Sequence, residues 1–300
     1  MAEWSNAADS KSVVLLVGTG GSNPPLSAKQ KGPYMEIFFY LSIGLVIFIL
    51  YLDIFYLIQN WVLFYPSIWY KSPEKISMPE FKENIINGLD GMPIMTWYYK
   101  GKKNKPAILF LHGNAWQIGT FAPQLKSIME EGYSILAMEY RGFANTRGHI
   151  AFESTLQDSI LAFDWLKAQG HSKIIVYAYS FGTAFACALT LSRPIDGMIL
   201  TSAFSSLKKL VMEKPIPFAF LALKDKYVSV DYLKKFDKPL LLIHGKNDHL
   251  IPYHHSQILY DNALTKDKKL VLIDKANHHT IYFSEKNIPA ILEFLKRKWG

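Results

Sequence analysis

Strand-like and helix-like segments alternate along most of this chain, and this alternation limits its fold more than any other feature. From about Glu83 to the C-terminus, short apolar runs are followed by amphipathic or small-residue helical runs. Strands connected through helices run parallel, so the pattern predicts an α/β domain over residues 83–300, with a mostly parallel central sheet and helices on both faces. The expected strands are 94–99, 107–111, 134–138, 173–179, 198–201, 240–243 and 270–273, and the expected helices are 121–131, 153–168, 181–191 and 288–298.

The segment before this domain is strongly apolar. Residues 37–52 are almost wholly hydrophobic, and a helix that starts at Met35 approaches the length of about 20 residues needed to cross a bilayer. We therefore expect residues 35–58 to form an uncleaved, single-pass transmembrane anchor. A cleaved signal peptide is one alternative, although no small-residue cleavage site follows. A hydrophobic helix packed on the domain is the other. Lys and Arg are not clearly enriched on one side of the segment, so the sequence does not determine on which side of the membrane the domain lies.

Two further segments flank the apolar run. Residues 1–34 are rich in Ser, Asn, Gly and Pro and show no apolar period, which predicts a disordered tail. The sequence of residues 1–34 also resembles conceptual translations of transfer-RNA genes. In that case the segment would be a spurious extension and Met35 the true start. After the apolar run, prolines break regular structure over residues 59–82, which we expect to form a neck.

Composition excludes several classes of function. The net charge is +8, but Lys and Arg are dispersed and no recognition motif accompanies them, so no nucleic-acid partner is expected. A mild attraction to anionic lipid headgroups fits this charge better. Cys187 is the single cysteine, which excludes an internal disulfide and a multi-cysteine metal site. We expect no cofactor and no metal.

Ser180 is the first candidate for chemistry. The apolar strand 174–179 runs directly into it, and a small-residue helix follows. A sharp turn of this kind lifts a serine hydroxyl towards a base and aims the next N–H, that of Phe181, at a developing oxyanion. The turn needs small neighbours: Gly182 fits, and Ala178 occupies the place where the usual motif has glycine. The alternative is a serine that only caps a helix.

A second turn follows the strand 107–111. Gly113 lets the chain bend there without a side chain in the way. The backbone N–H of Asn114 can then serve as a second oxyanion donor, with that of Ala115 as the less favoured alternative. We interpret His112 as a structural histidine that holds the loop.

The remaining parts of a catalytic set follow the last two strands. Asp248 lies just past a strand end, where a carboxylate can orient a histidine; otherwise it caps its own turn. Either His278 or His279 could reach both Ser180 and Asp248. A metal site at His254 and His255 lacks a carboxylate at suitable spacing. The other histidines are interpreted as loop or surface residues: His149, His171, His244, His249, His254 and His255.

Taken in order, these motifs resemble the membrane-anchored α/β-hydrolase-domain serine hydrolases of the bud-emergence-protein branch. The resemblance covers roughly residues 36–300. It implies an α/β-hydrolase fold with a small cap and the triad order Ser180, Asp248, His278. It favours His278 over His279 as the catalytic histidine. In the family this histidine follows an Ala-Gly-like pair, and Ala276-Asn277 aligns with that pair. The sequence departs from the family pattern at three positions: Ala178, Asn277 and His279. The matching pieces are 59–66, 111–115, 139–143, the Ser180 turn, 200–204, 244–248 with Pro252, and the histidine loop.

The resemblance and the motifs together predict a membrane-anchored serine hydrolase that cleaves an ester or thioester of an acyl or lipid substrate. The segment Ser205–Tyr227 lies where such folds carry a cap, and its apolar residues suit an acyl chain. A peptidase with the same triad is the first alternative, and a catalytically inactive, membrane-anchored binding protein is the second. A dehalogenase of this fold needs a carboxylate as its nucleophile, so Ser180 at that position excludes this activity. The acyl group, the leaving group and the oligomeric state stay open.

Overall fold

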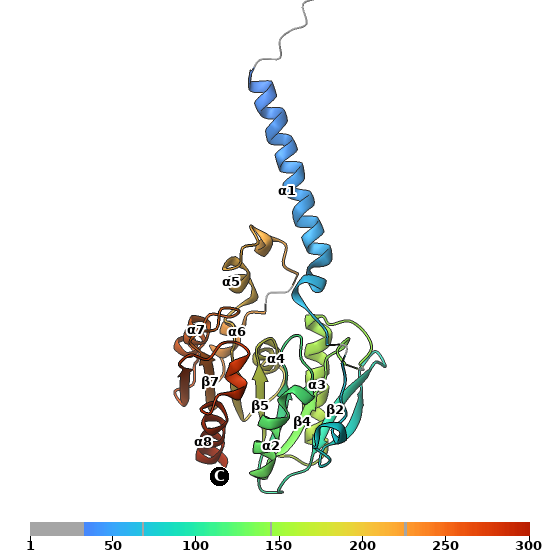
Figure 1. Ribbon diagram of the computed structural model, residues 1–300, viewed down its shortest axis with the longest axis vertical. Coiled ribbons are helices and arrows are strands. Elements are labelled where there is room, and N and C mark those ends of the chain that lie inside the picture. The colour runs from blue at the N-terminus through green and yellow to red at the C-terminus, as the bar shows by residue number, and fades with distance from the viewer. Residues whose placement is uncertain (1–32, 68, 145, 225–226) are drawn as a thin grey trace, which may run out of the picture. The chain divides into compact units, whose positions relative to one another are not determined.

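The computed structural model describes residues 33–67, 69–144, 146–224 and 227–300 (Figure 1). The tail or extension expected over residues 1–34 therefore lies almost wholly outside the described residues. The chain divides into two compact units, residues 1–48 and 49–300. The second unit holds one eight-stranded sheet with the strand order β1-β2-β4-β3-β5-β6-β7-β8. Its strands are β1 (Lys82–Asn87), β2 (Pro93–Tyr99), β3 (Ala107–Leu111), β4 (Ser134–Met138), β5 (Ile174–Tyr179), β6 (Gly197–Thr201), β7 (Leu240–Gly245) and β8 (Lys268–Ile273).

The sheet is mostly parallel, as the alternation predicts. Strands β3 to β8 pair in parallel, whereas β1 and β2 join the edge through antiparallel pairs. The five strands from β3 to β7 are buried at every residue, and strands covered on both faces are expected to read as continuous apolar runs. The edge strand β1 is not among the predicted strands, because its side chains are mixed and mostly exposed.

Helices cover both faces of the sheet (Figure 1). The side chains of β3 show the two faces, since Leu109 lies in one apolar cluster and Phe110 in the other. The first cluster includes side chains from α3, α4, α6 and α7, and the second includes side chains from α2 and α8. The predicted fold class is therefore confirmed. These helices are α2 (Ala122–Glu130), α3 (Phe152–Ala168), α4 (Gly182–Leu189), α6 (Ser229–Leu233), α7 (His254–Asn262) and α8 (Asn287–Trp299).

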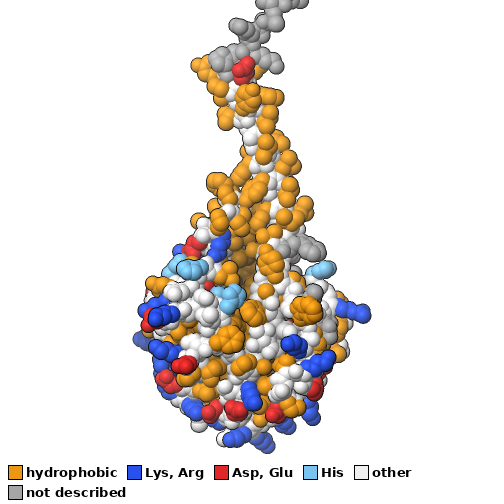
Figure 2. Space-filling model, viewed as in Figure 1, with side chains coloured by type: hydrophobic (Ala, Val, Ile, Leu, Met, Phe, Trp, Pro, Cys, Tyr) orange, Lys and Arg blue, Asp and Glu red, His pale blue; other side chains and the backbone are white. Residues whose placement is uncertain are grey.

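The apolar segment forms one long helix, α1 (Pro33–Leu63), and its stretch Tyr34–Asn60 is long and apolar enough to cross a membrane. Hydrophobic side chains cover its exposed surface (Figure 2). The helix continues five residues past Ile58, where we expected the neck to begin, because no helix breaker occurs before Pro66. The first half of α1 lies in the first compact unit and the second half in the second.

Between β6 and α6 the chain leaves the sheet in a short excursion, residues 205–224, which we name the cap segment. It contains α5 (Leu207–Met212) and the 3-10 turn η3 (Ala219–Leu221). This is the position of the small cap that the sequence predicts. The remaining 3-10 turns are η1 (Glu74–Ile76), η2 (Ile118–Phe121) and η4 (Thr280–Phe283).

A buried ion pair fixes the turn after β4 to α3. Two nitrogens of Arg141 donate to the two carboxylate oxygens of Asp158, at 2.6 and 2.7 Å, and both residues are buried. Asp90, which is half exposed, also contacts Arg141. Burial raises the pKa of Asp158, and the Arg141 guanidinium partly offsets this rise. The pair therefore depends on both partners remaining charged.

Candidate active site

The strand-to-helix turn at Ser180 has the sharp geometry that the sequence predicts. Ser180 lies between β5 and α4 with φ 49°, in the left-handed region that non-glycine residues rarely adopt. Its own N–H donates to the Thr201 carbonyl at 2.8 Å, and its carbonyl accepts from the Thr183 N–H at 3.0 Å. Backbone strain of this kind costs about 1–3 kcal/mol and persists only where the surroundings fix it.

Gly182 allows the close packing behind this turn. A Cβ atom at residue 182 would lie 2.4 Å from the Leu111 carbonyl oxygen and 2.5 Å from that of His112, closer than real contacts allow. Ala178, the departure from the family motif, is buried in the first apolar cluster and pairs with Leu111 across the sheet. A methyl group is thus accommodated at residue 178 but not at residue 182.

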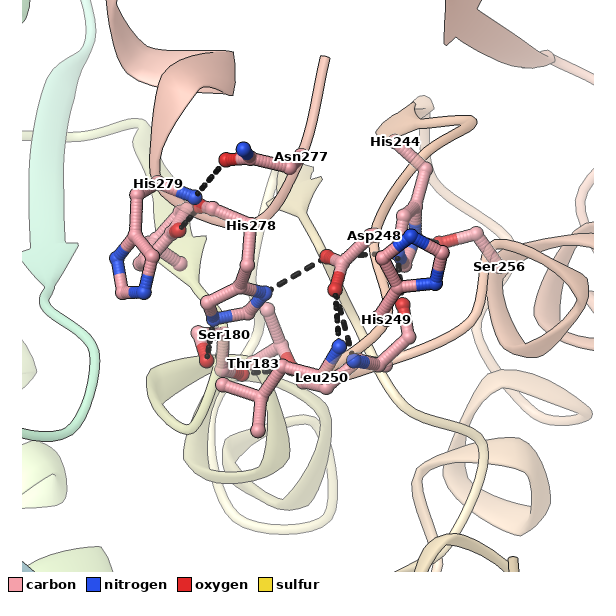
Figure 3. Close-up of polar contacts among 12 residues, drawn as sticks. Ser180, Thr183, His244, Asp248, His249, Leu250, Ser256, Asn277, His278 and His279 are labelled. Carbon is pink, nitrogen blue, oxygen red and sulfur yellow. Dashed lines mark hydrogen bonds and ion pairs between the residues drawn. The ribbon is translucent and has the colours of Figure 1, made fainter. Parts of the chain in front are cut away.

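The structure brings Ser180, His278 and Asp248 into one chain of hydrogen bonds (Figure 3). Ser180 Oγ lies 2.9 Å from His278 Nε2, and His278 Nδ1 lies 2.7 Å from Asp248 Oδ2. The three residues come from the ends of β5, β7 and β8, which lie at the same edge because these strands are parallel. The ring of His279 lies 5.7 Å from those of Trp116 and His278, and it is not one of the partners in this chain of hydrogen bonds (Figure 3).

Asp248 is held from several sides. Its Oδ1 accepts the N–H groups of Leu250 and Ile251 at 3.0 and 2.8 Å, and His244 Nε2 lies 3.3 Å from its Oδ2. Burial alone would disfavour the ionised form of Asp248. The hydrogen bonds from His244, from His278 and from the backbone outweigh that effect and lower the pKa of the carboxyl well below its usual value. Asp248 is therefore a carboxylate at neutral pH, as an orienting group must be.

His244 is a supporting residue that the sequence motifs did not reveal. The interpretation of His244 as a loop or surface residue is wrong, because it lies within β7 and is fully buried. Its Nδ1 bonds Ser256 Oγ at 2.6 Å, and its Nε2 lies 2.8 Å from the Ile251 carbonyl. The available signal was its place at the end of a wholly apolar strand, four residues before Asp248.

The loop that carries Asn114, one of the predicted oxyanion donors, approaches Ser180 closely, since a Cβ atom at residue 113 would lie 3.2 Å from the Ser180 Cβ. Phe181 is the residue directly before α4. In the loop after β3, the Asn114 side chain accepts the Ala115 N–H at 3.0 Å, so that N–H is engaged. The N–H of Asn114 is then the better candidate of the two. His112 is buried below the loop, with Nδ1 2.7 Å from the Gly113 carbonyl and Nε2 3.1 Å from a Glu139 oxygen, as a structural histidine would be.

A second histidine cluster joins the cap segment to α7. His254 Nε2 and His255 Nε2 lie 3.0 and 3.2 Å from the two Glu213 oxygens, and His255 Nδ1 lies 2.8 Å from Ser205 Oγ. The interpretation of His255 as a loop or surface residue is wrong, since it is fully buried. The sequence offers no carboxylate at suitable spacing from His254 and His255. The fold brings one to them from Glu213, at the end of α5.

Acidification is expected to weaken the fold through His255. Burial lowers the pKa of His255 from 6.5 to about 4, and the charges of His254 and Lys209 add to this against the attraction of Glu213. The unfolded chain binds this proton more readily than the folded one, so stability is lost as pH falls from about 6.5 towards 4, by roughly 2 kcal/mol. Thermal unfolding of the full chain over this pH range, compared with His255→Gln, measures the effect. An equal slope in the variant would contradict it.

Comparison with known proteins gives a family match across most of the second unit. The family model described as "Serine aminopeptidase, S33" matches residues 102–232 and 228–286. The matched region contains Ser180, Asp248 and His278.

Curated relatives include the lysophosphatidylserine lipase ABHD12 of Rattus norvegicus, 26% identical over 262 residues, with 77% of this chain and 62% of that protein covered. The chain thus spans less than two thirds of that relative. The uncharacterized protein Rv2307c of Mycobacterium tuberculosis is 26% identical, with 74% and 80% covered.

Among solved structures, the Pyrococcus furiosus esterase Pf2001 superposes with a TM-score of 0.65 at 24% identity, over 79% of this chain and 99% of that one. The esterase EaEST of Exiguobacterium antarcticum superposes with a TM-score of 0.60 at 18% identity, over 72% of this chain and 100% of that one. These likenesses show a shared fold. The family match is what confirms the resemblance to the α/β-hydrolase superfamily.

Proposed function

The chain belongs to the serine aminopeptidase S33 family of α/β hydrolases, and from this premise we propose that it is a membrane-anchored serine hydrolase that cleaves ester or thioester bonds of acyl substrates. The observation that carries the proposal is the chain of hydrogen bonds from Ser180 through His278 to Asp248. A serine hydroxyl becomes an effective nucleophile when a base takes its proton and a carboxylate orients that base. The geometry supplies both partners.

In the proposed mechanism, His278 Nε2 takes the proton of Ser180 Oγ as this oxygen attacks the acyl carbonyl. The resulting oxyanion accepts hydrogen bonds from the N–H groups of Phe181 and Asn114. His278 then gives its proton to the departing alcohol or thiol, and an acyl-serine remains. A water molecule, deprotonated by His278, attacks this ester, and collapse of the second intermediate returns the proton to Ser180. Asp248 stabilises the imidazolium in both halves.

Ester cleavage is favoured over the aminopeptidase chemistry that gives the family its description. An aminopeptidase must bind the α-ammonium group of a peptide, which calls for an accessible anion near the nucleophile. The buried carboxylates beside this site are engaged: Asp248 with His278, and Glu139 with the Ile118 N–H at 2.7 Å. Lipase and esterase are also the named activities of the relative and structural neighbours described above.

The proposed anchor is α1. We assign residues 35–58 to the membrane span, 59–82 to the neck and 83–300 to the catalytic domain, with the bilayer and an acyl-containing molecule as partners. The support is the length and apolar composition of Tyr34–Asn60. A helix of this length can cross a bilayer with some tilt.

The test of the catalytic proposal is Ser180→Ala. We expect this variant to lose at least about a thousandfold in the turnover of a short p-nitrophenyl ester, and to lose covalent labelling by a fluorophosphonate. The matched control, Ser154→Ala on α3, should keep both. Equal turnover by the Ser180 variant would refute the mechanism, and a folded protein that the probe never labels would favour the inactive binding protein. Faster cleavage of peptide amides than of esters would favour the peptidase.

A further inference from the structure

The candidate active site lies directly beside the end of the apolar helix. Phe64, four residues past the stretch that could cross a membrane, is buried with its ring edge-on to that of Phe181, at a centroid distance of 4.7 Å. The Asn114 side chain donates to the Leu63 carbonyl at 2.7 Å and accepts the Tyr65 N–H at 3.0 Å. Both oxyanion residues therefore contact the chain where it leaves the helix. If the helix spans a bilayer, as in the proposed function on which this inference rests, the site lies at the membrane surface.

The cap segment is bound to the same part of α1. Gln59 is buried, and its amide donates to the Ala222 carbonyl at 2.9 Å and accepts the Lys224 N–H at 2.8 Å. Two turns earlier, the Tyr51 hydroxyl donates to the Pro217 carbonyl at 2.8 Å. All of these residues belong to the second compact unit. Residues 217–224 are thus fixed next to the last turns of the proposed anchor.

The cap segment presents apolar and basic side chains outwards. Phe220 and Leu223 pack against the core, whereas Phe218 and Leu221 are exposed. The segment carries four lysines against one acid, Glu213. The lysines at 208, 209 and 224 are exposed, whereas Lys214 Nζ donates to two backbone carbonyls, at 2.6 and 3.2 Å. Exposed apolar side chains with lysines around them are typical of surfaces that rest in the headgroup region of anionic membranes.

We infer that the cap segment rests on the surface of a bilayer containing anionic phospholipids, with Leu221 and Phe218 in the apolar boundary and the exposed Lys208 and Lys209 at the phosphates. Its position beside the end of α1 makes this contact continuous with the anchor. The acyl substrate then enters the site from the bilayer rather than from solution. The exposed Leu221 contacts the membrane in this arrangement, and it takes no part in the chemistry at Ser180.

The experiment compares two substrates on the full chain reconstituted in phosphatidylcholine vesicles, with or without phosphatidylglycerol. One substrate is a short, water-soluble p-nitrophenyl ester, and the other is a long-chain p-nitrophenyl ester dissolved in the vesicles. Leu221→Ser should lower turnover of the long-chain ester about tenfold, because the lost apolar contact weakens docking. Turnover of the soluble ester should stay within about twofold.

Leu191→Ser is the matched control. Leu191 is 59% exposed, against 57% for Leu221, and it follows the C-terminal end of α4, at the edge of the sheet away from Ser180. We expect it to change neither activity. Phosphatidylglycerol should raise turnover of the long-chain ester severalfold in the wild type, and Lys208→Gln should reduce this gain.

Equal effects of Leu221→Ser and Leu191→Ser on the long-chain ester would overturn the inference, as would wild-type turnover that is indifferent to phosphatidylglycerol. Failure of the proposed function has a different signature. In that case Ser180→Ala would hydrolyse the soluble ester as fast as the wild type.

Discussion

His278→Ala is expected to hydrolyse a short p-nitrophenyl ester at least about a thousandfold more slowly than the wild type, while His279→Ala keeps most of the activity. Of these two histidines, His278 alone lies within hydrogen-bond distance of both Ser180 and Asp248. The His279 ring lies next to those of Trp116 and His278. The two variants differ by one position in the same loop, so each controls for the other. The measurement is kcat/KM for the soluble ester.

Covalent labelling by a fluorophosphonate gives a second reading of the same pair. His279→Ala should react with the probe about as fast as the wild type, whereas His278→Ala should react far more slowly, because no base then activates Ser180. A larger loss in His279→Ala than in His278→Ala would reverse the assignment of the base.

Asp158→Ala is expected to lower the free energy of unfolding by about 3 kcal/mol, because it leaves the buried Arg141 with only the half-exposed Asp90 as partner. Asp164→Ala is the matched control. It also removes a carboxylate that accepts from two arginine nitrogens, those of Arg193, but this pair is partly exposed and should contribute less than about 1 kcal/mol.

Urea unfolding of the full chain in a mild detergent measures both changes. Similar losses in the two variants would show that burial of the Arg141 pair has no special effect on stability. The Asp158 variant should still bind the fluorophosphonate probe at low temperature, since α3 contributes no residue to the site.

Much of this architecture follows from local sequence signals. The strands from β3 to β7 are continuous apolar runs, and the residues that follow them must meet at one edge of a parallel sheet. For this reason Ser180, Asp248 and a histidine after the last strand can be grouped from the order of the motifs along the chain. Ala178 is compatible with the turn because a strand interior accepts a methyl group, whereas residue 182 approaches another backbone.

The contacts that support the site could not be predicted in the same way. His255 follows the exposed His254 in sequence, and it is buried only because the cap segment packs against α7. The burial of His244, by contrast, could have been inferred from the wholly buried strand in which it lies. Glu213 meets His255 across 42 residues of chain. The docking of Phe64 on Phe181 depends on where α1 ends relative to two distant loops, and hydrophobic periodicity carries no such information. The strand β1 is not predicted because its side chains are mixed and mostly exposed, so no apolar run marks it in the sequence.

The hydrogen bonds between Asn114 and the end of α1 also determine where the chain could be shortened without damage. A fragment beginning at Pro66 would lack the Leu63 carbonyl and the Tyr65 amide, so the Asn114 amide would lose two partners. Phe181 would also lose its contact with the Phe64 ring. A fragment beginning at Ile49 would retain all of these contacts and also those of Gln59. The last four turns of the helix are therefore part of the catalytic unit. A soluble version of this protein has to retain this apolar segment of α1, from Ile49 to Leu63.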